Sequence, residues 1–314
     1  MGRRVSLVSR LALVAGLLLA TTPLAATAAA AAPAPAAATT KKQKVVASFY
    51  PLAFAAERVG GGRVTVRNLT PAGAEPHDLE LTPDQIDEVL DADLVLVLGR
   101  NFQPAVEKAA QERDGLTVRL LDVLPLNAGS KKVAEGNPSA LDPHVWLDPV
   151  LMSDIVTRVQ KALTKVDPRG ASTYRANADA LRTELAAVDG RYRRGLATCA
   201  RNLVVTSHEA FGYLARRYGL RQEGVAGLSP DAEPDPERLA ELTDLAKREH
   251  VTVIFTEELV SPRIAQTLAR EVGVRTDTLN PLEGLTPAEQ RAGANYFSVM
   301  DTNLQKLRRA LGCT

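Results

Sequence analysis

The chain has 314 residues, of which 45% are hydrophobic, enough to bury the core of one large domain or of two lobes. The formal net charge is +1, but residues 1–30 contain three arginines and no acidic residue. The rest of the chain therefore carries 35 basic and 37 acidic residues, a net charge of −2. Because no basic stripe is present, the composition argues against nucleic acid as a partner.

Residues 1–30 have the pattern of a secretory signal peptide. Arginines precede an apolar run at 11–20, and small residues in Ala-x-Ala spacing follow it. Residues 31–44 are rich in Ala, Pro and Thr and are expected to form a flexible tether. No cysteine occurs near the cleavage region, so lipid attachment is not expected there. The sequence thus predicts export to the cell surface or to a periplasm-like space.

Residues 45–169 alternate between β-rich runs and helical patterns. The β-rich runs are KVVASF, RVTVRNL, DLVLVLG and LTVRLLDV, and helices are expected near 51–61, 84–92 and 103–113. Four β-α repeats predict an N-terminal lobe with a mainly parallel four-stranded sheet. A further helix is expected at 149–166, with Asp148 as its N-cap.

A long helix is expected at 170–197, because its apolar residues recur with helical spacing. They are Tyr174, Ala178, Leu181, Leu185 and Val188. At 1.5 Å per residue this helix would be about 40 Å long, which is enough to link two lobes.

The β-α alternation restarts in residues 198–314. Strands are expected in NLVVT, LRQEGVAGL, VTVIFTEELV and VRTDTL, and helices between them include one capped by Ser261. One amphipathic helix is expected at 287–311. The predicted fold class is therefore α/β, with two Rossmann-like (β/α)4 lobes, each built on a mainly parallel four-stranded sheet, joined by one long rigid helix.

The chain contains two cysteines, Cys199 and Cys313. In an exported protein an even pair favours one disulfide, and two unpaired thiols are the alternative. Two cysteines are too few for a metal site built on cysteine.

Three of the four histidines lie where a ligand of a parallel α/β sheet would bind, outside the carboxyl ends of strands. His77 follows RVTVRNL, His208 follows NLVVT, and His144 lies in DPHVWLDP, which two Asp-Pro pairs stiffen. Asn280 and Glu283 follow the last predicted strand. Three imidazoles and one carboxylate in an interlobe cleft suit four-coordinate Zn²⁺, and Mn²⁺ is the second option because it prefers more oxygen ligands.

Each of these residues also has a purely structural interpretation. A single loop histidine is usually solvated or hydrogen-bonded, and Glu283 alone would be a surface charge. Three histidines at equivalent positions in a chain with only four weaken that interpretation. Trp146 is expected to pack beneath His144 rather than stack on a ligand, and His250, which ends a charged helix, is interpreted as structural.

Four motifs resemble a known family in sequence and in order. GAEPHDLELTP, DPHVWLDP, VVTSHEAFGYLARRYGL and LNPLEGL with AGANYFSVMDTNL are similar to the zinc/manganese solute-binding proteins of bacterial metal ABC transporters, the cluster A-I or cluster 9 family. The resemblance covers residues 45–311. It implies two (β/α)4 lobes that hold a metal ion between them through three histidines and one carboxylate. The histidines that match are His77, His144 and His208.

The fourth ligand departs from the common family pattern. Many members have an aspartate where this chain has Asn280, whereas members with the Asn-Pro-Leu-Glu version use the glutamate, which is Glu283 here. Asn280 and a water molecule are the alternatives. Glu75, Asn280 and Trp146 are interpreted as residues that support the ligands. Many zinc-specific relatives also carry a His-rich loop before the second histidine, but residues 126–141 contain no histidine, so Zn²⁺ and Mn²⁺ both remain open.

The predicted function is high-affinity capture of Zn²⁺ outside the cytoplasm and its delivery to the permease of an ABC transporter, by a monomer that catalyses no reaction. A Mn²⁺-binding protein with the same role is one alternative. A secreted zinc hydrolase or hydratase is another, because three-histidine zinc sites can be catalytic. Glu209 could act as a base, but TSHEAF lacks the HExxH pattern, and four protein ligands leave no position for an activated water. Nothing in the sequence supports an additional adhesin role.

Overall fold

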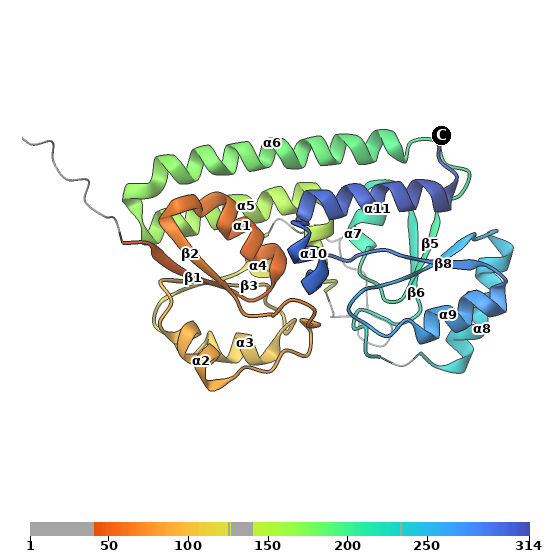
Figure 1. The fold of residues 1–314 in the computed structure, drawn as a ribbon, viewed down its shortest axis with the longest axis horizontal. Helices are drawn as coiled ribbons and strands as arrows, with labels where there is room; N and C mark the ends of the chain where they lie inside the picture. The colour runs from red at the N-terminus through yellow and green to blue at the C-terminus, as the bar shows by residue number, and fades with distance from the viewer. Residues whose placement is uncertain (1–40, 125, 127–140, 233) are drawn as a thin grey trace, which may run out of the picture. The chain divides into compact units, whose positions relative to one another are not determined.

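The computed structural model describes residues 41–124, 126, 141–232 and 234–314. The predicted signal peptide, residues 31–40 of the predicted tether and most of the loop at 126–141 lie outside the described residues. Within the described part of the chain, no helix is both long and apolar enough to cross a membrane. The two predicted lobes are present, each with a sheet of four parallel strands and flanking helices (Figure 1), so the predicted fold class is confirmed.

The first sheet has the strand order β2-β1-β3-β4, and all neighbours are parallel. Its strands are β1 (Gln43–Ala47), β2 (Val64–Asn68), β3 (Leu94–Val97) and β4 (Leu116–Arg119), and its helices are α1 (Tyr50–Gly60), α2 (Pro83–Leu90), α3 (Pro104–Ala109) and α4 (Leu120–Val123). β1 thus begins two residues inside the predicted tether. The run LTVRLLDV is a strand only as far as Arg119, because Leu120 and Leu121 turn into the core and start a helical turn closed by the bond from Leu124 N to Leu120 O.

The second sheet repeats the arrangement, with the order β6-β5-β7-β8 and parallel neighbours throughout. Its strands are β5 (Leu203–Thr206), β6 (Arg221–Gly224), β7 (Val253–Thr256) and β8 (Arg275–Thr278), and its helices are α7 (Gly212–Arg217), α8 (Pro236–Arg248), α9 (Arg263–Val272), α10 (Pro287–Arg291) and α11 (Tyr296–Leu311). In both sheets the first strand in sequence lies beside the third. Chains leave these two neighbours in opposite directions, which opens a ligand-binding crevice at their carboxyl ends.

Two local predictions in this lobe were wrong. The predicted helix at 287–311 is broken into α10 and α11, because Gly293 adopts φ +73° and Asn295 caps the new helix through bonds from Phe297 N and Ser298 N. Ser261 does not cap α9, since Pro262 occupies the N-cap position and no side-chain capping bond forms.

The first lobe ends with η3 (Val145–Leu147), α5 (Pro149–Val166) and η4 (Pro168–Gly170), and the 25-residue α6 (Ala171–Gly195) links it to the second lobe. Asp148 caps α5 as predicted, by accepting bonds from Val150 N and Leu151 N. α6 packs on α1 and α5 of the first lobe and on α11 of the second (Figure 1).

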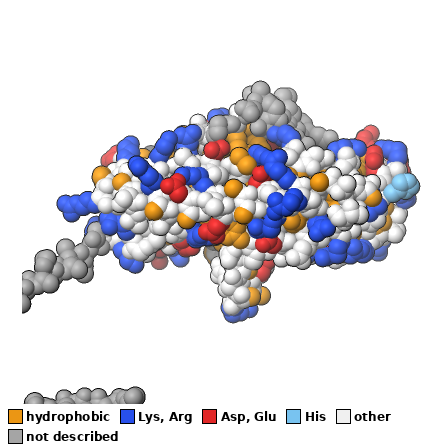
Figure 2. Space-filling view, turned by 90° about the horizontal axis from the view of Figure 1, so that it is seen from above, with side chains coloured by type: hydrophobic (Ala, Val, Ile, Leu, Met, Phe, Trp, Pro, Cys, Tyr) orange, Lys and Arg blue, Asp and Glu red, His pale blue; other side chains and the backbone are white. Residues whose placement is uncertain are grey.

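The buried face of α6 contains the predicted stripe, Tyr174, Ala178, Leu181, Leu185 and Val188, and also Tyr192. The opposite face is solvated. Figure 2, which views the molecule from the side of α6, shows Lys and Arg spread over this surface among Asp and Glu, with hydrophobic groups scattered singly. Ion pairs such as Arg193–Asp189, at 2.8 Å, account for part of this pattern.

One hydrophobic core extends across both lobes. It includes Leu96 of the first sheet, Leu185 of α6 and Phe255 of the second sheet. Each sheet also has one smaller core on its other face. It lies under α2 and α3 in the first lobe and under α8 and α9 in the second. The lobes therefore share a core along α5, α6 and α11, and these packed side chains close one side of the crevice between the lobes.

Cys199 and Cys313 form the predicted disulfide, which links the residues just after α6 to the end of α11. Arg201 N also donates a hydrogen bond to Leu311 O beside it, and Thr314 N donates one to Thr198 O. The link therefore fastens the chain that enters the second lobe to the last helix of that lobe.

Candidate metal centre

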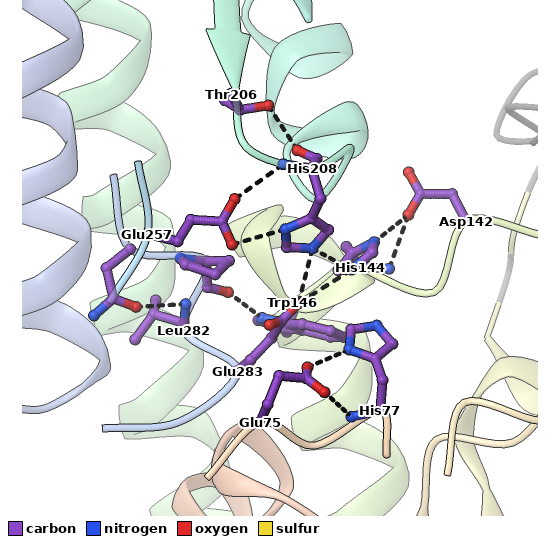
Figure 3. Close-up of polar contacts among 12 residues, drawn as sticks. Glu75, His77, Asp142, His144, Trp146, Thr206, His208, Glu257, Leu282 and Glu283 are labelled. Carbon is purple, nitrogen blue, oxygen red and sulfur yellow. Dashed lines mark hydrogen bonds and ion pairs between the residues drawn. The ribbon is translucent and has the colours of Figure 1, made fainter. Parts of the chain in front are cut away.

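The four residues proposed as ligands meet between the two lobes, two from each. His77 lies in the loop after β2 and His144 precedes η3, whereas His208 follows β5 and Glu283 follows β8. His144, His208 and Glu283 are at most 1% exposed, and the side chain of His77 is 11% exposed. Residues separated by more than 200 positions in the sequence thus converge in a buried site (Figure 3).

The candidate ligand atoms are close together and point toward a common centre (Figure 3). His144 Nε2 lies 3.3 Å from His208 Nε2, and Glu283 Oε1 lies 3.2 Å from each of these nitrogens. The ring of His77 lies 5.7 Å from that of His144 and 6.1 Å from that of His208, measured between centroids. Its Nε2 is buried and has no hydrogen-bond partner among the described residues.

These separations fit a small tetrahedral ion. With metal–ligand bonds of about 2.1 Å, the ligands of a tetrahedral zinc ion lie about 3.4 Å apart. The three separations of 3.2–3.3 Å among His144, His208 and Glu283 are close to one face of such a tetrahedron. Ligand atoms of His77, His144 and Glu283 also lie within 4.8 Å of one another. The unpartnered Nε2 of His77 is therefore available as the fourth corner.

A carboxylate holds each of the first two histidines at two atoms. Glu75 Oε1 lies 2.5 Å from His77 Nδ1, and Glu75 Oε2 accepts a bond from His77 N at 2.8 Å. Asp142 Oδ1 lies 2.8 Å from His144 Nδ1 and accepts from His144 N at 3.0 Å. In both cases the carboxylate stands two residues before the histidine, in the tripeptides Glu-Pro-His and Asp-Pro-His.

The third histidine has an equivalent partner from a different strand. Glu257, which follows β7, places Oε2 2.7 Å from His208 Nδ1 and accepts a bond from His208 N through Oε1 at 3.1 Å. A neutral imidazole that donates Nδ1–H to a carboxylate keeps its Nε2 lone pair free for a metal. All three rings are therefore oriented with Nε2 toward the centre, as metal ligation requires.

Asp142 and Glu257 were missed at the sequence level. A signal for Asp142 was present, because Glu75-Pro-His77 and Asp142-Pro-His144 repeat the same pattern. The only sequence signal for Glu257 was its position directly after a buried strand, at the sheet edge where His208 also lies. No local pattern links Glu257 to His208, since 49 positions separate them.

Asn280 is engaged away from the cluster. Its Oδ1 accepts a bond from Leu282 N at 2.7 Å, and its Nδ2 donates to Glu289 Oε1 at 3.0 Å. The first bond closes a turn in which Leu282 adopts the left-handed φ of +58°. Asn280 thus shapes the backbone that presents Glu283. His250 lies outside the cluster, at the end of α8, where its N donates to Lys247 O.

The charges of the site shift the titration of its members. Burial lowers the pKa of His208, but the charges of Glu257 and Glu283 outweigh it and hold this pKa well above 6.5. Burial likewise acts to lower the pKa of His144, but the hydrogen bonds of His144 to Asp142 and Glu283 outweigh this effect and raise the pKa above its usual value. Burial would raise the pKa of Glu283, yet His208 and His144 keep it well below its usual range. The pocket therefore favours positive charge next to an ionised Glu283.

The approach to His77 is acidic. Glu75, Asp78 and Asp231 place carboxylate oxygens within 4.8 Å of one another on the more exposed side of the site. Asp78 and Asp231 come from opposite lobes, and the hydrogen bond between their carboxyl groups raises the pKa of Asp231. Such a rim raises the local concentration of cations.

Comparison with known proteins identifies the family. Residues 45–310 match the family described as ZnuA, zinc-uptake complex component A, periplasmic. The chain belongs to the ZnuA family. It is 38% identical over 278 residues to the zinc-binding lipoprotein AdcA of Streptococcus pneumoniae, a match that covers 85% of this chain and 56% of AdcA. It is 36% identical over 280 residues to the high-affinity zinc uptake system protein ZnuA of Bacillus subtilis, covering 86% of this chain and 88% of that protein.

Solved structures of ZnuA-like proteins share the fold. The Zn(II)-bound ZnuA-like domain of Streptococcus pneumoniae AdcA superposes with a TM-score of 0.72 at 36% identity, covering 86% of this chain and 99% of that domain. The laminin-binding protein Lmb of Streptococcus agalactiae, described as bifunctional with adhesin and metal transporting activity, gives a TM-score of 0.77 at 30% identity, with coverages of 86% and 100%. The resemblance inferred from the four sequence motifs is thus confirmed. The chain spans about half the length of the AdcA relatives.

Proposed function

We propose that this ZnuA-family protein captures Zn²⁺ outside the cytoplasm and delivers it to the permease of an ABC transporter. The observation that carries the proposal is the convergence of two imidazole Nε2 atoms and one carboxylate oxygen at 3.2–3.3 Å, with the Nε2 of His77 beside them. His77, His144, His208 and Glu283 would bind the ion, with two ligands from each lobe.

The ligand set favours Zn²⁺ over Mn²⁺. Three imidazole nitrogens and one carboxylate are typical of tetrahedral zinc, whereas Mn²⁺ prefers an octahedral shell rich in oxygen. The relatives agree with this preference, since AdcA is named a zinc-binding lipoprotein and the Bacillus subtilis protein a zinc uptake protein. A Mn²⁺ carrier is therefore the less favoured alternative.

The same geometry argues against a zinc hydrolase or hydratase. A catalytic zinc keeps one position open for water, while a structural or transport site is closed by protein ligands. Here Glu283 Oε1 lies 3.2 Å from two of the histidine nitrogens, where a catalytic water would bind. When all four side chains bind the metal, no coordination position is left for a water nucleophile.

Delivery to a permease follows from the family, whose description names an uptake complex and a periplasmic component. Location outside the cytoplasm agrees with the arginines and apolar run of residues 1–30. The AdcA relatives of Streptococcus pneumoniae are named lipoproteins, and residues 1–40 of this chain contain no cysteine. We propose that the carrier acts as a monomer, since all four ligands come from one chain.

Metal binding can be measured with a reporter that the chain already contains. Trp146 is its single tryptophan, and its ring lies 5.2 Å from that of His144, so bound metal should change its fluorescence. Metal-stripped protein is titrated with Zn²⁺ and Mn²⁺, separately and in competition. We expect one Zn²⁺ per chain and displacement of Mn²⁺ by Zn²⁺. A preference for Mn²⁺ would instead support the alternative carrier.

The ligand assignment is tested by His144→Ala, with His250→Ala as the matched control. The first change removes one corner of the proposed shell and should weaken Zn²⁺ binding by orders of magnitude. His250 lies outside the cluster at the end of α8, so its replacement should leave the affinity unchanged. Wild-type affinity in His144→Ala would overturn the assignment. In zinc-limited bacteria that lack the native carrier, growth should return with the wild type and not with His144→Ala.

A further inference from the structure

A hydrogen bond joins the two chain segments that present ligands from opposite lobes. Trp146 Nε1 donates to Pro281 O at 2.8 Å. Trp146 follows His144 by two residues, and Pro281 precedes Glu283 by two. The bond therefore spans the interlobe crevice directly beside the 3.2 Å approach of His144 Nε2 to Glu283 Oε1.

The tryptophan end of this bond is held firmly. The indole is fully buried, and its ring packs against Phe49 at 4.8 Å, Phe102 at 5.7 Å and His144 at 5.2 Å, measured between centroids. Phe102 in turn lies 4.6 Å from the ring of His77. The indole thus contacts one ligand directly and a second through one aromatic ring, so its position affects both ligands of the first lobe.

The Pro281 end is held with equal firmness. Asn280 Oδ1 accepts from Leu282 N, which closes the turn around Pro281. Asn303 of α11 brackets Asn280, since its Nδ2 donates to Asn280 O at 2.7 Å and its Oδ1 accepts from Asn280 N at 3.1 Å. Pro281 has a fixed φ as well. The carbonyl that receives the indole N–H therefore cannot move without breaking several buried bonds.

A second bond ties the same residue to the second lobe. Tyr296 of α11 donates its hydroxyl to Trp146 O at 2.7 Å, and both residues are fully buried. Trp146 is thereby bonded to the second lobe through its side chain and through its backbone.

Resting on the proposed function, we propose that Trp146 is a positioning residue that fixes the separation of His144 and Glu283 and thereby sets the selectivity for Zn²⁺. A site held at tetrahedral zinc distances binds Zn²⁺ with little rearrangement. Mn²⁺ needs longer bonds and additional oxygen ligands, so the framework must expand to admit it. A rigid connection between the lobes makes that expansion unfavourable, and loosening it reduces the discrimination.

The test is Trp146→Phe, which keeps an aromatic ring in the cavity and removes the indole N–H. Dissociation constants for Zn²⁺ and Mn²⁺ are measured calorimetrically with a competing chelator. Loss of a residue that orients ligands typically costs 10–100-fold in metal affinity. We expect the Zn²⁺ dissociation constant to rise about tenfold and the Mn²⁺ constant far less, so that the selectivity ratio, the Mn²⁺ constant divided by the Zn²⁺ constant, falls.

The matched control is Tyr192→Phe. Tyr192 is fully buried and donates its hydroxyl to Met300 O at 2.7 Å, which links α6 to α11 through a bond that involves neither Trp146 nor a proposed ligand. This variant loses a comparable buried bond and should melt at a lower temperature, but its selectivity ratio should equal that of the wild type. An equal loss of affinity for both ions in Trp146→Phe would overturn the proposal.

A second variant decides the matter if Trp146→Phe does not fold. Tyr296→Phe removes the other bond to Trp146 and leaves the indole in place, so it should lower the selectivity ratio in the same direction. An unchanged ratio in folded Tyr296→Phe would then overturn the proposal. Failure of the proposed function is distinct from either result, because it would appear as absent zinc binding in the wild type.

Discussion

Glu257 binds His208 at two atoms, its Oε1 accepting the backbone N–H at 3.1 Å and its Oε2 lying 2.7 Å from Nδ1. The two residues follow neighbouring parallel strands, β7 and β5, so the sheet register brings them together. Glu257 is 6% exposed, and water therefore competes little for its oxygens. This carboxylate fixes both the orientation and the tautomer of the imidazole.

Replacing Glu257 with Gln should weaken Zn²⁺ binding by about 10–100-fold, because the amide keeps the shape but loses the charge that supports the ligand. Glu258→Gln is the control. Burial raises the pKa of Glu258 to about 7, and its Oε2 has no hydrogen-bond partner among the described residues. Its neutralisation should leave zinc affinity unchanged. Titration calorimetry on both variants checks this, and equal effects would contradict the assigned role of Glu257.

Glu283→Ala should weaken Zn²⁺ binding far more than Asn280→Ala. The first change removes the proposed ligand oxygen, while the second removes the bond from Leu282 N that shapes the turn. Asn280→Ala should chiefly lower the melting temperature, since it also leaves Glu289 without the amide at 3.0 Å. Calorimetry and thermal unfolding separate the two effects. If Asn280→Ala proved the more damaging to binding, the fourth ligand would have to be reassigned.

Zinc affinity should rise with pH through the neutral range. In the metal-free protein the pKa of His208 lies well above 6.5 and that of His144 is also raised, so Zn²⁺ must displace protons from these rings. Chelator competition between about pH 6 and pH 8.5 should show a decreasing dissociation constant. An affinity that does not depend on pH would contradict the protonation of the metal-free site.

The same pKa shifts determine how stability depends on pH. A pKa raised by folding stabilises the metal-free protein below about 6.5, and this contribution is lost as pH rises through the folded-state value. The metal-free protein should therefore lose stability at alkaline pH, whereas the gain in melting temperature from added Zn²⁺ should increase. Melting curves with and without Zn²⁺ across the same pH range measure both trends.

Removing the disulfide should destabilise the fold without altering the metal site. The bond between Cys199 and Cys313 closes a segment of 114 positions, for which the loop-entropy model gives about 4–5 kcal/mol. Replacing both cysteines with Ser should lower the unfolding free energy measured in denaturant. Zinc affinity should stay near that of the wild type, because neither cysteine contacts a proposed ligand. A large loss of affinity would show that this end of α6 is coupled to the site.

Those parts of the site that are marked by a local sequence pattern could be predicted from the sequence. His77 and His144 lie in proline-stiffened segments, and Glu75 was predicted as a supporting residue, whereas Asp142 was missed although the same acid-Pro-His pattern contains it. The role of Glu257 could not be predicted from the sequence, because its contact with His208 depends on which strands are neighbours. Likewise, nothing in a linear pattern indicated that Trp146 would donate a bond to Pro281, 135 positions away.

The sequence by itself determined the parallel α/β lobes, the long helix and the histidines at strand ends, because hydrophobic periodicity and proline positions act over a few residues. It misplaced the ends of β4, α9 and α10, where tertiary contacts or a left-handed glycine override local pattern. Only the tertiary structure decided the 3.2–3.3 Å geometry of the ligands and the carboxylate that supports each ring. Those distances arise from the packing of two lobes on a shared core, and such packing is a property of residues that are distant in the chain.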